Sequence, residues 1–270
     1  MKKIGSVTKL IRYPIKSMQG EEINTSIITK KGLLGDRAYA LIDTKTNKIV
    51  SAKNPKKWSN IFKYNSKFIT EPSQKNMTDV QIIFPNNSII SSSEKNIDAL
   101  LSSSFNRNVK LTSTVPREVQ LEEYYADIQE MEQPNAVEDA TMVNGTFFDL
   151  GTIHLLTSST IAKLKELYPE GDFNINRFRP NIFIDLDVTT IEFIENDWVG
   201  KEIAIGNEVI LKVKQPCPRC VMTTLEQKNI VKDTNILKTA IKNNNGNIGV
   251  YADVVRTGTI NNNDIIQIIS

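Results

Sequence analysis

Short runs of β-branched and apolar residues, separated by turn residues, recur along almost the whole chain. Runs of this length and composition are typical of β-strands. Because they follow one another closely, they favour barrels or sandwiches over a sheet in which strands alternate with helices. We therefore predict a mainly β (α+β) fold with two β-barrel-like units and a few peripheral helices. The predicted strands cover residues 7–13, 37–42, 48–52, 80–84, 109–113, 146–150, 181–185, 202–205, 208–213, 248–255 and 265–269.

Three segments carry helix signals instead. Residues 158–168 begin with hydroxyl side chains that suit a helix N-terminus, repeat apolar residues on one face and end before Pro169. A second helix is predicted over residues 235–243 with Thr234 as its cap, and a short third helix over residues 94–101.

An acidic segment interrupts the pattern at residues 121–139, with Pro134 inside it. Its charge indicates a solvated connector more strongly than a metal site, so we predict a loop there. This loop is the best candidate for a boundary in a chain of 270 residues. The sequence thus predicts two domains, at residues 1–120 and 121–270.

Composition excludes several classes of protein. The net charge is +2 and the basic residues are spread along the chain, which argues against a nucleic-acid groove. No apolar run is long enough for a signal peptide or a membrane span, so we expect no membrane association. Two cysteines in a chain of this size indicate a reducing compartment, and we expect the protein in the cytoplasm.

Both cysteines, Cys217 and Cys220, lie in one short motif that contains an arginine. A zinc site needs four ligands and the chain adds only His154, while an iron–sulfur cluster normally needs four thiolates. Covalent haem attachment requires histidine where Val221 stands. A thioredoxin-like pair usually opens a helix, whereas residues 221–225 are typical of a strand. Two alternatives remain: a thiolate that binds a metal otherwise held by non-protein ligands, or two plain thiols.

Two further segments near the N-terminus carry polar groups at bends. Lys16 and Ser17 follow a predicted strand, where their donors can converge on an anion. Arg37 opens an apolar strand and needs a partner, which is Asp36, Asp43 or an anionic ligand.

A third polar segment precedes the strand predicted at residues 181–185. Arg177, Arg179 and Asn181 offer bidentate donors and a mixed amide group, a set that suits a phosphate or the edge of a heterocycle. Salt bridges to nearby aspartates are the alternative.

Taken together, these segments resemble the MOSC proteins, the relatives of the molybdenum-cofactor sulfurase C-terminal domain and of the mitochondrial amidoxime-reducing component. The resemblance covers nearly the whole chain, with a MOSC N-terminal β-barrel domain first and the MOSC domain second. Four motifs occur in the order and approximate spacing of that family: Pro14-Ile-Lys16-Ser17, Gly35-Asp36-Arg37, Arg179-Pro180-Asn181 and Cys217-Pro218-Arg219-Cys220.

The resemblance implies a molybdenum cofactor (molybdopterin), in which a pterin dithiolene supplies two sulfurs to the metal. By matching position, Cys217 is the molybdenum ligand and the catalytic residue. A helix N-terminus after Leu156 matches a family segment close to the cofactor, and such a terminus suits an anion. The residues matched to cofactor binding are Lys16, Ser17, Arg37, Thr157, Ser158, Arg179, Asn181 and Tyr251.

By the same resemblance we expect an oxidoreductase that reduces small N-hydroxylated compounds. The chain holds no further cysteines for a cluster, so we expect electrons from a separate donor protein of flavin, haem or iron–sulfur type. The alternative is a carrier that hands on the cofactor, or sulfur as a persulfide of Cys217. The resemblance also predicts pyridoxal phosphate binding, at the level of the domain.

Overall fold

The structure, a computed structural model, describes residues 2–117, 120–125, 135–187 and 190–269. Contacts divide the chain into two compact units, and neither unit is continuous in sequence. The first, here called the barrel unit, comprises Met1–Ile11, Glu22–Leu34 and Gly151–Ser270. The second unit comprises Arg12–Glu21 and Gly35–Leu150.

Seven strands of the barrel unit form a closed barrel. Their order is β14-β13-β17-β16-β15-β19-β1, and β1 pairs in turn with β14. The mainly β fold predicted from the sequence is therefore confirmed. The barrel strands are β1 (Lys2–Arg12), β13 (Ile153–Thr157), β14 (Ile182–Leu186), β15 (Glu202–Ile205), β16 (Val209–Pro218), β17 (Asn247–Arg256) and β19 (Ile265–Ile268). The short strands β2 (Glu21–Ile23), β3 (Thr25–Thr29), β4 (Gly32–Leu33) and β18 (Gly258–Asn261) accompany them.

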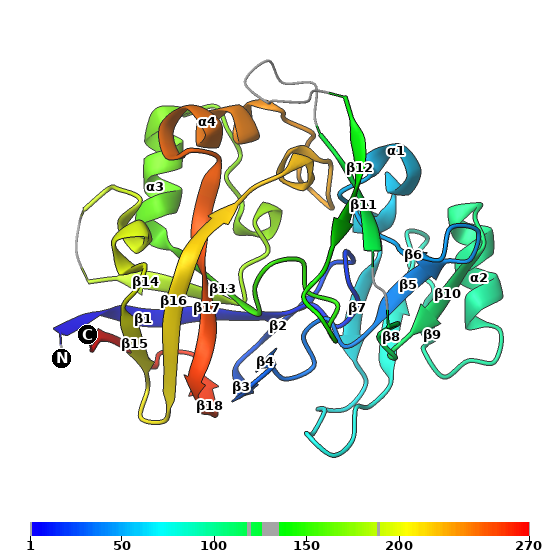
Figure 1. The fold of residues 1–270 in the computed structure, drawn as a ribbon, viewed down its shortest axis with the longest axis horizontal. Coiled ribbons are helices and arrows are strands. Elements are labelled where there is room, and N and C mark those ends of the chain that lie inside the picture. Colours follow the sequence, from blue (N-terminus) through cyan, green and yellow to red (C-terminus); the bar gives the residue numbers. More distant parts are fainter. Residues whose placement is uncertain (1, 118–119, 126–134, 188–189, 270) are drawn as a thin grey trace. The chain divides into compact units, whose positions relative to one another are not determined.

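Alternation along the strands fills the barrel. In β16, Val209, Leu211 and Val213 are buried, while the residues between them are partly exposed. Since successive side chains of a strand point to opposite faces, this pattern directs every second residue into the core. Figure 1 shows β16 and β17 running side by side, as their antiparallel pairing requires.

Two α-helices of the barrel unit, α3 (Ser158–Leu167) and α4 (Asn235–Asn244), lie beside each other (Figure 1). Both agree closely with the predicted helices. The side chain of the predicted cap Thr234 accepts no capping hydrogen bond, and near it the amide of Asn235 donates to Asp233 Oδ1 at 2.9 Å. Short 3₁₀ turns complete this unit at η2 (Ile175–Arg177), η3 (Ile194–Trp198) and η4 (Val221–Thr224).

The second unit contains a five-stranded sheet and a three-stranded sheet. The larger sheet has the order β10-β5-β6-β11-β12, and the smaller has the order β7-β8-β9. Its strands are β5 (Ala40–Asp43), β6 (Lys48–Ile49), β7 (Asn65–Phe68), β8 (Val80–Ile83), β9 (Ile89–Ser91), β10 (Val109–Thr112), β11 (Gln120–Tyr124) and β12 (Val137–Thr141). Its helical segments are α1 (Pro55–Trp58), η1 (Ile61–Lys63) and α2 (Ile97–Phe105).

The acidic segment predicted as a loop contributes to two strands. Glu122 of β11 pairs with Asp139 of β12, and Lys48 and Lys57 lie within salt-bridge distance of Glu122. Lysines therefore neutralise the acidic strand residues, which is why their charge does not force a loop. Residues 126–134 lie outside the described residues.

Two predicted strands are wrong for local reasons. Residues 146–150 form turns, because the Thr146 hydroxyl donates to Val143 O and accepts from the amide of Phe148. The segment at residues 221–225 is largely the 3₁₀ turn η4, in which the Thr223 hydroxyl donates to Cys220 O. Hydroxyl side chains that bond to nearby backbone compete with strand pairing.

The division into domains at residue 120 stays a prediction about sequence modules. The compact units follow contacts instead, since β1 at the N-terminus pairs with β14 and β19 from the C-terminal half. Among the described residues, the structure contains no helix long and apolar enough to cross a membrane.

Candidate functional site

Cys217 lies near the end of β16, between two prolines. The register of β16 against β17 shifts between Pro216 and Pro218, and Cys217 is fully buried there. Proline has no backbone N–H to donate, so two prolines interrupt the ladder and favour a bulge. The sequence thus places one thiol on a well-packed strand at the point where regular pairing fails.

Arg219 holds the sulfur of Cys217 directly. Its Nη1 donates to Cys217 Sγ at 2.7 Å, and its Nη2 donates to Phe178 O at 2.8 Å. Burial alone would raise the pKa of the Cys217 thiol, but Arg219, His154 and Tyr251 together lower it to about 6. At neutral pH the thiolate therefore predominates, and the thiolate is the form that binds soft metals.

His154 lies on β13, which pairs with β17, and β17 in turn pairs with the strand β16 that carries Cys217. The Nε2 of His154 lies 3.1 Å from Ile248 O, and its ring lies 5.7 Å from the ring of Tyr251. Gly249 permits this approach: it has a φ of +79°, and a Cβ there would lie 2.3 Å from His154 Nε2. Only glycine satisfies both requirements.

Asn181 connects this histidine to the barrel wall. Its Oδ1 accepts from the amide of His154 at 3.1 Å, and its Nδ2 donates to Ile11 O at 3.3 Å. Asn181 therefore fixes β13 against β1 through its side chain, in addition to any contact with a ligand.

The segment that carries Arg179 reaches Cys217 through Arg219, because the acceptor Phe178 directly precedes Arg179. Arg179 itself is 5% exposed. Arg177 has a different role: its guanidinium donates to the carbonyl oxygens of Asp172, Thr223, Leu225 and Val231 and holds that loop in place.

Three of the residues predicted from the sequence have a left-handed backbone conformation. Among the described residues, the positions with positive φ are occupied by glycine, by asparagine or by three others: Ser17 (φ 67°), Arg37 (φ 49°) and Arg179 (φ 54°). All three were predicted to bind the cofactor. Left-handed backbone costs such residues about 1–2 kcal/mol, and strain of this kind clusters at functional sites.

The hydroxyl groups of Thr157 and Ser158, at the start of α3, differ in their hydrogen-bond partners. Thr157 Oγ1 accepts from the amide of Thr160 and donates to Glu195 Oε2 at 2.7 Å, so its proton is directed inward. Ser158 Oγ accepts from the amide of Leu186 at 3.3 Å, which leaves its proton available for a ligand. Of these two predicted residues, Ser158 is the better donor and Thr157 is chiefly a helix cap.

Glu195 is a buried carboxyl that the sequence did not reveal as important. Thr157 and Thr160 both donate to its Oε2, at 2.7 and 2.6 Å. Burial raises the pKa of Glu195, and the two hydroxyl groups offset part of this rise. Its Oε1 is buried without a hydrogen-bond partner among the described residues.

In the second unit, Lys16 is 5% exposed and its Nζ pairs with Asp149 Oδ1 and with Phe147 O, the latter at 2.9 Å. Burial lowers the pKa of Lys16, and Asp149 offsets part of this effect. Ser17 is buried as well, and its Oγ accepts from the amide of Ala52 at 3.1 Å.

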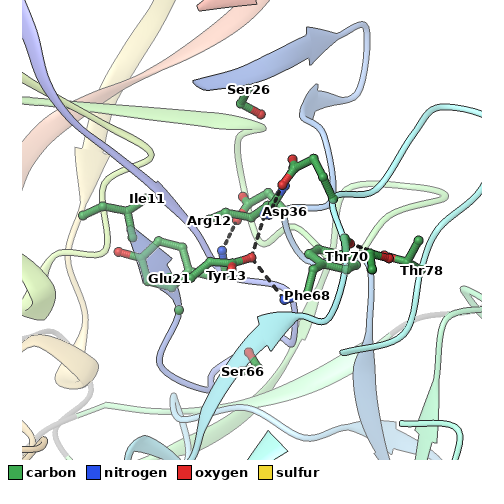
Figure 2. A network of polar contacts seen from close by, with 12 residues as sticks. Ile11, Arg12, Tyr13, Glu21, Ser26, Asp36, Ser66, Phe68, Thr70 and Thr78 are labelled. Atoms are coloured by element: carbon green, nitrogen blue, oxygen red, sulfur yellow. Dashed lines mark hydrogen bonds and ion pairs between the residues drawn. The ribbon is translucent and has the colours of Figure 1, made fainter. Parts of the chain in front are cut away.

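Arg37 pairs with Asp36, one of the partners considered from the sequence. Asp36 also accepts from the amide of Tyr13 at 2.8 Å, and the Arg37 guanidinium lies 4.7 Å from the centre of the Tyr13 ring. Figure 2 shows Asp36 directed toward Tyr13. The acid, the ring and the left-handed backbone together fix the direction of this arginine.

The residue before Tyr13 anchors the same turn. Arg12 is buried and pairs with Glu21 and Glu71, and Glu21 Oε1 also accepts from the amide of Phe68 (Figure 2). Burial opposes the charge of Arg12, but the two glutamates raise its pKa overall. This network is structural, since each of its charges is already paired within the second unit.

The predicted residues thus form two groups. In the barrel unit, hydrogen bonds and ring contacts connect Cys217, Arg219, His154, Tyr251 and Asn181. In the second unit, Lys16, Ser17 and Arg37 lie on turns of one short region around Tyr13 and Tyr39. The binding roles of all these residues stay predictions.

The barrel group fits a metal that brings most of its own ligands. The part of the chain that the structure describes contains no group of three or more His, Cys, Asp or Glu residues arranged to hold a metal. One thiolate beside an arginine suits a dithiolene-bound metal with an anionic group. Arg219 Nε, which is buried without a hydrogen-bond partner among the described residues, is a further donor for such a group.

Family comparison now identifies the chain. Residues 4–92 match the MOSC N-terminal beta barrel domain, and residues 146–267 match the MOSC domain. The chain belongs to the MOSC family. These two matches place Lys16, Ser17 and Arg37 in the first domain of the family and the Cys217 group in the second.

Similar solved structures share little sequence with this MOSC protein. The YUAD protein from Bacillus subtilis is 9% identical, with 97% of this chain and 94% of that chain covered and a TM-score of 0.46. YiiM from Geobacillus stearothermophilus is 20% identical, with 44% and 55% covered and a TM-score of 0.33. The chain therefore spans about half the length of that YiiM protein. No curated protein matches the sequence.

Proposed function

We propose that this MOSC protein binds a molybdenum cofactor and reduces small N-hydroxylated compounds. The observation that carries the proposal is the buried Cys217 sulfur, to which Arg219 Nη1 donates at 2.7 Å at a bulge of β16. Family membership supports the cofactor, and the resemblance to amidoxime-reducing proteins supports the reaction.

When bound, the cofactor supplies two dithiolene sulfurs and the redox chemistry of the metal. Cys217 supplies the protein sulfur, and Arg219 keeps that sulfur ionised. His154 and Tyr251 also interact with this sulfur and contribute to lowering its pKa. By the family resemblance, Lys16 and Arg37 of the second unit and, separately, Arg179 of the barrel unit are the cations expected to bind the cofactor, and Ser158 is expected to contribute a hydroxyl donor.

A reductase of this kind needs a source of electrons, and the resemblance leaves that source to another protein. We propose a separate donor protein that carries a flavin, a haem or an iron–sulfur cluster. Its encounter with this chain is expected to be transient, as electron-transfer complexes are.

A sulfur or cofactor carrier is the second candidate function. The low pKa of the Cys217 thiol favours it too, because a thiolate accepts sulfur readily. Cys217 is completely buried, whereas a persulfide must reach its acceptor. A cofactor metal must reach the same sulfur, so burial does not separate the two functions, and the family resemblance to amidoxime-reducing proteins is what favours the reductase.

The test is to purify the protein from a host that makes molybdopterin and from a matched host that cannot. Molybdenum and pterin are measured in both preparations, and the turnover of a benzamidoxime is followed with a chemical reductant. The reductase proposal expects about one molybdenum per chain and turnover only in the first preparation. Metal-free protein that carries sulfane sulfur in both preparations would establish the carrier instead.

A further inference from the structure

The ion pair between Lys16 and Asp149 is unequally exposed. The Lys16 side chain is 5% exposed, whereas that of Asp149 is 27% exposed. The ammonium group is also held from within by Phe147 O at 2.9 Å. Asp149 is therefore the more exposed partner of the ion pair, and solvent reaches its carboxylate more readily than it reaches the ammonium group of Lys16.

Asp149 is held as a carboxylate by more than one cation. Burial alone would raise its pKa, but the charges of Lys16, Lys53 and Arg37 hold the pKa well below the usual range. Lys53 is itself paired with Glu123, and Arg37 is paired with Asp36. Each cation of this region thus already has an acid partner within the second unit.

The backbone that carries Asp149 forms neither helix nor strand over residues 142–152. A side chain on such a segment can leave its partner without breaking a ladder of hydrogen bonds. Lys16, by contrast, lies in the turn held to Tyr39 by backbone bonds, so the cation keeps its place when the acid moves.

We propose that Asp149 is an internal counter-ion that occupies the anion-binding position of Lys16 and keeps small inorganic anions from it. The inference rests on the proposed function, which places Lys16 at the phosphate of the cofactor. A free phosphate ion can displace Asp149 only with the free energy of its own contact with Lys16. A cofactor that also binds through its pterin and metal displaces Asp149 with the energy of all its contacts.

The probe is inorganic phosphate, titrated calorimetrically into protein from the host without molybdopterin. Asp149→Asn keeps the shape of the side chain and removes its charge, and we expect it to bind phosphate about tenfold more tightly than the parent chain. The double variant Lys16→Met with Asp149→Asn is expected to lose this gain. Asp139→Asn is the matched control, because Asp139 pairs with Lys48 in the same unit and should leave phosphate affinity unchanged.

A second arm does not depend on the folding of Asp149→Asn. Because Asp149 already blocks Lys16 in the parent chain, Lys16→Met alone should change phosphate affinity less than twofold. A tenfold loss in this variant would show that Lys16 is open to phosphate and would overturn the inference. A folded Asp149→Asn protein with unchanged or weaker phosphate binding would overturn it as well.

The failure of this inference is distinguishable from the failure of the proposed function. Loading of Lys16→Met with molybdopterin, measured after production in the competent host, reports on the function. If loading falls while Asp149→Asn gains nothing for phosphate, the counter-ion role is wrong and the cofactor site stands. If loading is unchanged while Asp149→Asn binds phosphate more tightly, the counter-ion role stands and the assignment of Lys16 to the cofactor is wrong.

Discussion

The barrel unit and the second unit arrange opposite charges in opposite ways. In the barrel unit, the sulfur of Cys217 lies on a strand and accepts a hydrogen bond from the cation Arg219. In the second unit, the cations Lys16 and Arg37 lie on turns. Asp149 forms an ion pair with Lys16, and Asp36 forms an ion pair with Arg37. The barrel unit therefore combines a sulfur anion with the arginines Arg179 and Arg219, whereas the polar turns of the second unit present the cations Lys16 and Arg37, each with its own acid.

Under the proposed function, the sulfur of the barrel unit is expected to bind a metal and the cations of the second unit are expected to bind a phosphate. A metal ligand benefits from a rigid element, since a small displacement changes the coordination. Phosphate-binding cations tolerate more freedom, because charge attraction varies slowly with distance. Substitutions in the barrel unit should therefore have the larger effects.

The largest effect is expected from a comparison of the two cysteines. Cys217→Ser replaces a soft thiolate with a hard and mostly protonated hydroxyl group, so reductase activity should fall by orders of magnitude. Cys220→Ser keeps the metal ligand and should retain much of the activity. Metal analysis and turnover of both purified variants check this, and equal inactivation would indicate a redox pair rather than a single ligand.

The next effect compares the two units directly. Arg179→Ala in the barrel unit should lower molybdopterin occupancy about tenfold, since a charge-assisted hydrogen bond is worth about 1.5–3 kcal/mol. Lys16→Met in the second unit should lower it less, because a lysine meets phosphate as a point charge on a flexible stem.

Arg179→Asn is the control for strain in this comparison. Asparagine tolerates the left-handed backbone at φ 54°, so the variant removes the charge and keeps the turn. Thermal unfolding and pterin content are measured together. Normal occupancy in a folded Arg179→Asn or Arg179→Ala protein would contradict the assignment.

A smaller effect separates a cap from a ligand donor at the start of α3. Thr157→Val removes the N-cap and one donor to Glu195, so it should destabilise the fold by about 1–2 kcal/mol. Ser158→Ala removes only the long hydrogen bond from the Leu186 amide, so it should destabilise the fold less than Thr157→Val while it lowers cofactor loading several-fold. Melting temperature and pterin content distinguish the two, and a reversed pattern would show that Thr157 faces the ligand.

The smallest effect concerns Glu195 and pH. Its folded pKa is raised above the ordinary value of 4.5, so the folded chain retains a proton that the unfolded chain releases. This contribution to stability is complete below pH 4.5 and is lost as pH rises through the folded pKa. Glu195→Gln does not titrate, so its melting temperature should fall less than that of the parent chain between pH 4.5 and neutrality. Parallel slopes for the two proteins would show that Glu195 ionises normally.

Local signals predicted the elements whose causes are local. The helix predicted at residues 158–168 is α3, because its capping hydroxyl and its terminal proline act within a few residues. The strands β16 and β17 follow their alternating patterns in the same way. The strand predicted at residues 146–150 is wrong because a turn held by the hydroxyl group of Thr146 can have the same residue composition as a strand.

The sequence by itself determined the mainly β fold, the family and the motifs that contain Lys16, Arg37, Arg179 and Cys217. Only the tertiary structure decided which partners those residues have. Asp149 lies 133 positions from Lys16, and Glu195 lies 38 positions from Thr157. No periodicity connects such positions, because barrel closure and long turns bring them together. The energy of an ion pair depends on the distance between its charges in space. Residues far apart in the sequence reach that distance only when the core has formed around them.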